Sequence, residues 1–287
     1  MDGLRRHLDV EIVELSFPAT SRLRSAAADL LWYPRLRPPG GTDVLHCPTF
    51  RGPFRASGPL VVTVHDLGVL RHPEWFNRWT ARYSRAAVPR VVRAATRVIA
   101  VSEFTKRELV ALLGTPPGKI RVVPNAVEDV FVPDGPRAEG EYVLAVGTLE
   151  PRKNLARIAR AVAGELRVVG AAGWRDVEMP ANVSWLGRVS DEELASLLRG
   201  ARCLVYASLY EGFGIPVAEA LACGCPIVTT RDSAMTEVAG GDAVYLHPLD
   251  LASIREGISR AAAPTPRRGA SWVEVAARTR AVYEEVA

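Results

Sequence analysis

Short β-rich runs alternate with longer helical stretches along most of the chain, and this alternation constrains the fold more than any other feature. In the front half we predict strands at 60–65, 97–101 and 120–123, with helices at 78–95 and 103–113. Such alternation is typical of a parallel sheet covered by helices. Pro89 is expected to interrupt the first helix, because proline lacks the amide proton that a helix interior needs.

A second alternating series follows residues 133–140, which hold two prolines and two glycines. Its predicted strands are 142–146, 167–169, 183–186, 202–207 and 226–229, and a capping box starting at Ser190 opens a helix. We interpret 133–140 as a linker between two α/β domains, 1–132 and 141–262. A further break at 263–269 precedes a last helical segment within 271–287.

Composition excludes several classes of protein. The chain of 287 residues is 48% hydrophobic and 24% charged, which is typical of a globular protein with a substantial core. No apolar run approaches the ~20 residues of a membrane-spanning helix, and the residues after Met1 lack the apolar core of a secretory signal. We expect a cytoplasmic protein whose four cysteines are reduced thiols rather than metal ligands.

Positive charge is concentrated in the front half. Residues 1–135 hold 19 Lys or Arg against 13 Asp or Glu, a net charge of +6, and the remainder has a net charge of −2. Arg78, Arg82, Arg85 and Arg93 share one face of the predicted helix. This face can lie on anionic lipid at the inner side of a membrane, hold a phosphorylated acceptor, or be merely solvated. Nucleic-acid binding is disfavoured because no module that reads DNA or RNA accompanies the charge.

The stretch 210–224, YEGFGIPVAEALACG, is the most informative. Gly212 and Gly214 permit close approach by a ligand, Pro216 suits the first helical position, and Gly224 suits the position after the helix end. The start of such a helix presents N–H groups to an anion. Two glutamates flank this turn: Glu219 can accept two hydrogen bonds from a vicinal diol, while Glu211 reaches another part of the same ligand. The alternative is a pair of solvated surface glutamates.

Glu211-x7-Glu219, together with Gly212-Phe213-Gly214-Ile215-Pro216, resembles the signature of the retaining nucleotide-sugar glycosyltransferases of family 4. Further matching segments are 122–127, 146–154 and 186–190. The resemblance implies the GT-B fold, with two Rossmann-like domains facing a cleft and the last helix returning to the first domain. It also implies metal-independent transfer of a hexosyl unit, with retention, from a nucleotide sugar to a glycan or lipid-linked acceptor, as in polysaccharide biosynthesis.

The resemblance also assigns donor-binding residues. Lys153 and Arg152 would bind the donor diphosphate, Glu219 the ribose, and Glu211 the transferred sugar together with the backbone of Gly212, Phe213, Gly214 and Ile215. The alternative for the two cations is a solvated pair at a helix start. Thr148 stands where many relatives carry an arginine, so one phosphate contact is either missing or supplied by Arg152.

In the first domain, the resemblance places His65 in the cleft beside the transferred sugar, where it would take part in catalysis by hydrogen bonding. Without the resemblance, a packing role would be favoured for a lone histidine. Asp66 is expected to orient His65, and His46 is a weaker cleft candidate.

The N-terminus departs most from the family. The first βα unit is expected to be missing, and residues 10–15 match a later strand of the relatives. A misplaced start codon and a natural truncation that reduced activity both explain this departure. The rival to an enzyme is therefore a catalytically silent nucleotide-sugar-binding or scaffold protein. A dehydrogenase is disfavoured, since no Gly-x-Gly-x-x-Gly follows an early strand.

Overall fold

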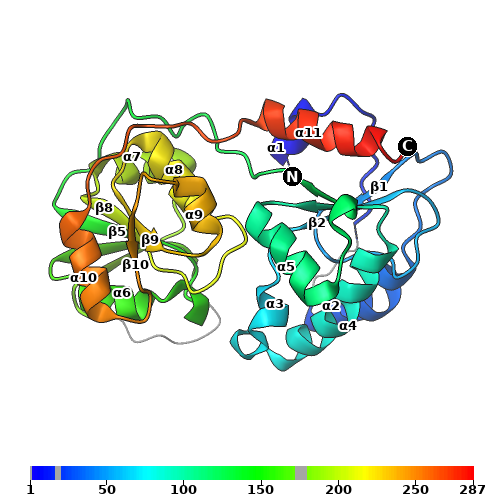
Figure 1. The fold of residues 1–287 in the computed structure, drawn as a ribbon, viewed down its shortest axis with the longest axis horizontal. Coiled ribbons are helices and arrows are strands. Elements are labelled where there is room, and N and C mark those ends of the chain that lie inside the picture. The colour runs from blue at the N-terminus through cyan, green and yellow to red at the C-terminus, as the bar shows by residue number, and fades with distance from the viewer. Residues whose placement is uncertain (1, 17–20, 172–179) are drawn as a thin grey trace. The chain divides into compact units, whose positions relative to one another are not determined.

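The computed structural model describes residues 2–16, 21–171 and 180–287 (Figure 1). The chain forms two compact units: unit 1 comprises the residues up to Asn125 together with Trp272–Ala287, and unit 2 comprises Ala126–Ser271. Each unit contains its own parallel sheet. The α/β class predicted from the alternation of strands and helices is therefore confirmed.

The sheet of unit 1 has four strands in the order β1-β2-β3-β4, all paired in parallel. They are β1 (Leu45–Cys47), β2 (Leu60–Val64), β3 (Arg97–Ala100) and β4 (Ile120–Val122). Helices of the unit include α1 (Asp2–His7), α2 (Arg22–Ala27), α3 (Gly68–Arg71), α4 (Arg78–Ala94) and α5 (Glu103–Leu113). Every residue of β2 is buried, as expected for an interior strand with helices on both faces. Ser102 caps α5 as predicted, since its hydroxyl accepts a hydrogen bond from the Thr105 amide.

Two local predictions for unit 1 are wrong. Pro89 does not interrupt α4, which runs unbroken from Arg78 to Ala94. By helical geometry Pro89 lies on the side of α4 that carries the exposed arginines. Proline has no amide to donate to the carbonyl of Arg85, but on this side water can donate to that carbonyl instead. Residues 10–15 form no strand, and Val13 is 62% exposed. An alternating segment that pairs with no strand of the sheet gains little from an extended conformation.

The sheet of unit 2 has six parallel strands in the order β10-β9-β8-β5-β6-β7. They are β5 (Tyr142–Val146), β6 (Glu165–Val169), β7 (Val183–Gly187), β8 (Cys203–Tyr206), β9 (Ile227–Thr230) and β10 (Val244–Leu246). The helices are α6 (Leu155–Ala161), α7 (Asp191–Gly200), α8 (Ile215–Cys223), α9 (Ala234–Ala239) and α10 (Leu251–Arg260). Two apolar clusters cover the two faces of this sheet, one including α7 and α8 and the other α6 and α10. The chain reverses its direction of winding between β5 and β8, the position where open α/β sheets bind ligands.

The boundary between the units lies earlier than the linker expected at 133–140. Val127 and Phe131, which are 2% and 1% exposed, belong to the core of unit 2. The Val127 amide also donates to the carbonyl of Ala270, 2.9 Å away. Residues 126–132 are thus held by unit 2, because their apolar side chains gain more from its core than from solvent.

The last helix, α11 (Trp272–Glu284), belongs to unit 1. Val275, Ala276 and Val282 are buried, and the helix packs against α1. A Cβ on Gly3 would lie 2.2 Å from the Trp272 ring, so glycine is needed there. Beyond the end of α11, Glu285 pairs with Arg97 and Arg121 of the sheet.

Among the described residues, no helix combines the length and the apolar character needed to cross a bilayer.

Candidate functional site

The predicted donor residues gather at the carboxyl ends of β5 and β8, where the winding of the unit 2 sheet reverses. The 3-10 turn Pro151–Lys153 follows β5, and the loop after β8 leads into α8. The Leu209 amide donates to the carbonyl of Arg152 at 2.8 Å, which joins the loop to the turn. On the other side of the loop, the Thr230 hydroxyl donates to the carbonyl of Ser208 at 2.9 Å. Two neighbouring strands therefore fix the position of Glu211.

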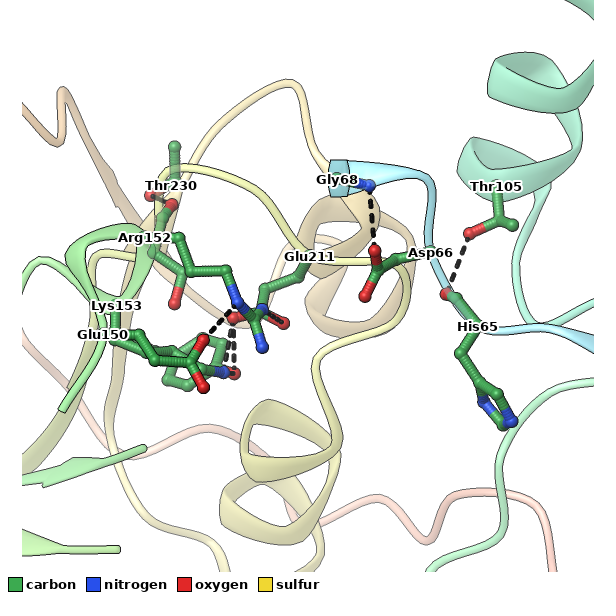
Figure 2. A network of polar contacts seen from close by, with 11 residues as sticks. His65, Asp66, Gly68, Thr105, Glu150, Arg152, Lys153, Glu211 and Thr230 are labelled. Atoms are coloured by element: carbon green, nitrogen blue, oxygen red, sulfur yellow. Dashed lines mark hydrogen bonds and ion pairs between the residues drawn. The ribbon is translucent and has the colours of Figure 1, made fainter. Parts of the chain in front are cut away.

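Glu211 is the centre of a buried network of charged groups (Figure 2). Only 7% exposed, it accepts hydrogen bonds from Lys153 Nζ at 2.6 Å and from Arg152 Nη1 at 3.0 Å. The Tyr206 hydroxyl accepts a hydrogen bond from Lys153 Nζ at 2.7 Å. It donates one at 3.0 Å to Glu211 Oε1, the oxygen that Lys153 also contacts. Arg152 also donates from Nε to Glu150 at 2.8 Å. Two cations and two carboxylates thus balance each other in this network.

The pKa values of the network follow from burial and from these partners. Burial alone would raise the pKa of Glu211, but Lys153 and Arg152 more than offset it, so that the pKa is lowered. Burial lowers the pKa of Lys153, and the Glu211 carboxylate opposes that shift. Burial and the Glu211 carboxylate raise the pKa of Tyr206. Tyr206 therefore keeps its proton and can donate it to Glu211.

The segment between Glu211 and α8 adopts the strand–turn–helix arrangement predicted from its glycines. Gly214 has φ +94, and a Cβ there would lie 2.8 Å from Met235 Cγ, so both the backbone angle and the packing require glycine. Gly224 ends α8 in the left-handed conformation, as predicted. The helix begins at Ile215, which is 40% exposed, so Pro216 stands one residue later than expected. The N-terminus of α8, which is the positive end of the helix dipole, follows closely after Glu211 and its cation partners.

Glu219, on α8, has neighbours different from those of Glu211. Burial raises its pKa to about 8, with Asp191 and Glu128 adding to the shift. Asp191 is the first residue of α7, so the start of α7 brings negative charge close to Glu219 on α8. The structure thus gives the two glutamates of the sequence motif different electrostatic surroundings, one among cations and one among carboxylates.

Unit 1 contains the predicted histidines. His65 follows β2 and is exposed, with Nε2 3.0 Å from the carbonyl oxygen of Pro48. Thr105 Oγ1 donates to the His65 carbonyl at 3.4 Å (Figure 2). Asp66 does not orient His65: its carboxylate accepts from the amide of Gly68 at 2.8 Å, at the start of α3.

His46 is a packing residue rather than a cleft residue. Its Nδ1 lies 2.6 Å from the Tyr283 hydroxyl and its Nε2 lies 2.8 Å from Thr63 Oγ1. Burial, and secondarily the charge of His65, lower its pKa to about 4. A neutral imidazole donates from one nitrogen and accepts at the other, and each hydroxyl can complement either role. His46 therefore joins the sheet to α11 as a neutral side chain.

Four contributors to these surroundings were not predicted: Tyr206, Glu150, Asp191 and Glu128. Glu150 lies within the segment 146–154 that matches the family, so its position there was a usable signal. Tyr206 ends an apolar run and looks like a core residue from sequence, since only the fold shows that its hydroxyl meets Lys153. Asp191 reads as a first-turn residue of a helix, which it also is.

A groove of about 880 Å3 lies at the amino ends of the unit 2 strands, opposite the carboxyl ends that hold the predicted donor residues. Its walls include Tyr142 and Glu165, at the starts of β5 and β6, and Arg160 and Arg255. None of the predicted site residues lines it, and in α/β sheets ligand chemistry belongs to the carboxyl ends of the strands.

Comparison with sequence families divides the chain at almost the same place as the structure. The profile of Glycosyltransferase Family 4 matches residues 3–131, and that of Glycosyl transferases group 1 matches residues 128–261. O-antigen chain mannosyltransferase B of Escherichia coli is 30% identical in an alignment of 262 positions that covers 81% of this chain and 67% of that protein. The MMP alpha-(1->4)-mannosyltransferase of Mycolicibacterium hassiacum is 31% identical, over 79% of this chain and 65% of its own length. The chain thus spans about two thirds of these relatives.

Solved structures support the fold. Sucrose-phosphate synthase from Thermosynechococcus elongatus superposes with a TM-score of 0.62 at 19% identity, covering 86% of this chain and 70% of that one. HepE from Anabaena, crystallised with UDP-glucose, gives a TM-score of 0.62 at 19% identity, covering 85% and 74%. At this identity the likeness concerns the fold, and it is the GT-B fold predicted from the sequence.

Proposed function

Because the chain belongs to glycosyltransferase family 4, we propose that it transfers a hexosyl unit from a nucleotide sugar to a glycan or lipid-linked acceptor. The observation that carries the proposal is the buried Lys153–Glu211–Arg152 network beside the start of α8. Mannose is our first candidate for the sugar, since O-antigen chain mannosyltransferase B is similar over most of the chain.

The network suits a diphosphate that carries a sugar. Lys153 and Arg152 supply cations, and the α8 start supplies a positive dipole end, so the negative charge of a leaving diphosphate would be stabilised as it develops. In the free protein both cations are paired with Glu211. Donor binding would thus exchange partners: the phosphates take the cations, and the Glu211 carboxylate becomes available to the hydroxyls of the sugar.

Retention follows from the proposed geometry of attack. The bond between the anomeric carbon and the diphosphate oxygen breaks while the acceptor oxygen attacks from the same face. The acceptor proton passes to the leaving diphosphate, so that charge and atoms balance without a covalent intermediate. His65 would hydrogen-bond the transferred sugar and Glu219 would fasten the ribose. No metal ion is part of this proposal, and no cluster of three or more candidate ligands occurs among the described residues.

A donor panel tests the proposal and its rival. We expect a nucleotide sugar to raise the melting temperature of the wild-type protein, in proportion to the logarithm of its concentration over its dissociation constant. Transfer or donor hydrolysis should accompany binding, and His65→Ala should lower turnover roughly a hundredfold while donor binding persists. Binding by the wild type without any turnover would instead favour the silent nucleotide-sugar-binding protein.

Glu219→Gln should separate stability from donor binding. The folded-state pKa of about 8 exceeds the value of 4.5 for an unpaired glutamate, so the carboxyl group costs stability increasingly as pH rises from 4.5 to 8. The amide avoids repulsion by Asp191 and Glu128. We expect the variant to be more stable than the wild type at pH 8 by about 2 kcal/mol, which is less than the ~5 kcal/mol of the full shift because Glu219 is only half-buried. It should nevertheless bind the donor at least tenfold more weakly, because an amide accepts fewer hydrogen bonds from a diol.

Urea unfolding at pH 5 and pH 8 and a donor titration measure the two effects. Glu139→Gln, on an exposed residue of unit 2 that precedes β5, is the matched control and should change neither. A variant that lost stability at pH 8, or that bound the donor like the wild type, would contradict the assigned role of Glu219.

A further inference from the structure

Helix α4 carries a cationic surface that the proposed sugar transfer does not use. Five arginines occur in its 17 residues, Arg78, Arg82, Arg85, Arg90 and Arg93, and all five are exposed. The helix contains no acidic residue. On a helical wheel the five side chains occupy a single arc of about 140°, so they form one face, which we call the α4 arginine face.

In the part of the chain that the structure describes, the five arginines of α4 have no carboxylate partner, unlike several other arginines of unit 1. Within residues 2–16, 21–171 and 180–287, none of the five forms an ion pair. By contrast, carboxylates pair with Arg5, Arg51, Arg71, Arg97 and Arg121. Holding five like charges on one helix without compensation costs stability through mutual repulsion. An external polyanion would remove that cost.

The cationic surface continues onto the neighbouring segment. Arg90 stacks over the ring of Phe54 at 5.8 Å, and the segment 48–59 that contains Phe54 adds the exposed Arg55; its other arginine, Arg51, is paired with Asp29. At the same, C-terminal end of α4, Lys119 Nζ donates to the carbonyl of Arg93 at 2.9 Å. Trp79, 45% exposed, lies at one margin of the arc.

The dimensions of the face identify its partner. From Arg78 to Arg93 the helix rises about 22 Å, so one phosphate group reaches no more than two of the five arginines. A stacking platform for single-stranded nucleic acid would need several exposed aromatic rings, whereas Tyr83 is buried and Phe54 lies under Arg90. A surface of anionic headgroups satisfies all five guanidinium groups at once, and an exposed tryptophan suits the headgroup level.

We propose that the α4 arginine face docks the protein on an anionic lipid bilayer. Attraction between basic residues and anionic lipid is additive over neighbouring charges and is screened by salt. The docking needs no donor residue, so it stands independently of the proposed sugar transfer. If the acceptor is lipid-linked, docking keeps unit 1 at the surface in which that acceptor lies.

Flotation of the full chain with vesicles tests the proposal. Vesicles of phosphatidylcholine alone are compared with an equimolar mixture of phosphatidylcholine and phosphatidylglycerol, over a series of salt concentrations. We expect binding to the anionic vesicles only, weakening as salt rises. The triple variant Arg78→Gln, Arg82→Gln, Arg85→Gln should bind roughly a hundredfold more weakly.

The matched control removes the same charge from exposed arginines of unit 2, with Arg202→Gln, Arg255→Gln and Arg260→Gln. It should float like the wild type and keep its melting temperature. The α4 triple variant should melt at or above the wild-type temperature, because it removes repulsion, and both triple variants should keep the donor-induced thermal shift of the wild type. Equal binding to neutral vesicles, or equal loss in the two triple variants, would overturn the proposal. Binding to duplex DNA without flotation would overturn it too and assign the face to nucleic acid.

Discussion

Glu211→Gln is expected to lower the free energy of unfolding by about 3–5 kcal/mol at neutral pH. The carboxylate is 7% exposed and balances Lys153 and Arg152, whose side chains are 11% and 20% exposed. Glutamine keeps the size of the side chain but removes the charge, so two cations remain close together in a poorly solvated position. Urea unfolding of the wild type and the variant measures the difference.

Glu165→Gln is the control for this prediction. Glu165 pairs with Arg167 at 2.8 Å, but its side chain is 37% exposed, and pairs of that kind contribute at most about 1 kcal/mol. If both variants lost the same free energy, burial would not be what makes the Glu211 network strong.

A double-mutant cycle with Glu211→Gln and Lys153→Met measures the interaction energy between Lys153 and Glu211 apart from their other contacts. Methionine fills the same space without charge, so the double variant leaves fewer uncompensated groups than Glu211→Gln alone. We expect the second substitution to restore part of the stability that the first removes, while transfer activity stays lost. Additive losses would mean that Lys153 and Glu211 do not interact across the 2.6 Å that separates them.

The elements that could be predicted from sequence are those whose local signals agree with their packing. The helix Glu103–Leu113 and the strand Tyr142–Val146 have the bounds expected for them. In the first case the Ser102 cap and Gly114 mark both ends. In the second, a continuous apolar run matches an interior parallel strand.

Other elements escaped prediction because their signals are weak or are overridden. The strands β1 and β10 have three residues each: His46 interrupts the apolar residues around β1, and the apolar run 243–246 at β10 is too short to indicate a strand. Pro89 argued against a continuous α4, but Val88, Val91 and Val92 are buried beneath it and hold the helix together. For α4, tertiary packing therefore outweighed local preference.

The candidate site shows the same division. Glu211, Lys153 and Arg152 were predicted through motif and resemblance, and the structure brings these three together. Tyr206 was not, because an apolar strand residue reveals its hydroxyl contact only when β8 lies beside the turn after β5. Nor could the spacing of Glu211 and Glu219 show that one lies among cations and the other among carboxylates, since those neighbours come from distant parts of the chain.

The link between the sheet of unit 1 and α11 should make that unit sensitive to mild acid. His46 has a pKa of about 4 in the folded protein, mainly because it is buried, against 6.5 for a free histidine. Above pH 6.5 His46 is neutral in both the folded protein and the unfolded chain, and the full stability is present. Between pH 6.5 and 4 the unfolded chain takes up a proton that folded His46 refuses, so stability falls with pH, by about 3 kcal/mol in total.

His46→Gln isolates this contribution, because glutamine can still hydrogen-bond to Tyr283 or Thr63 but does not titrate. We expect the variant to be less stable than the wild type at pH 7, where an imidazole fits both hydroxyls, and the gap to close as pH falls to 4.5. Urea unfolding at pH 7, 5.5 and 4.5 tests this, with His247→Gln as an exposed control that should follow the wild type. Parallel pH profiles for His46→Gln and the wild type would mean that His46 takes up its proton as readily in the folded protein as in the unfolded chain, and that burial between the sheet and α11 does not hold it neutral.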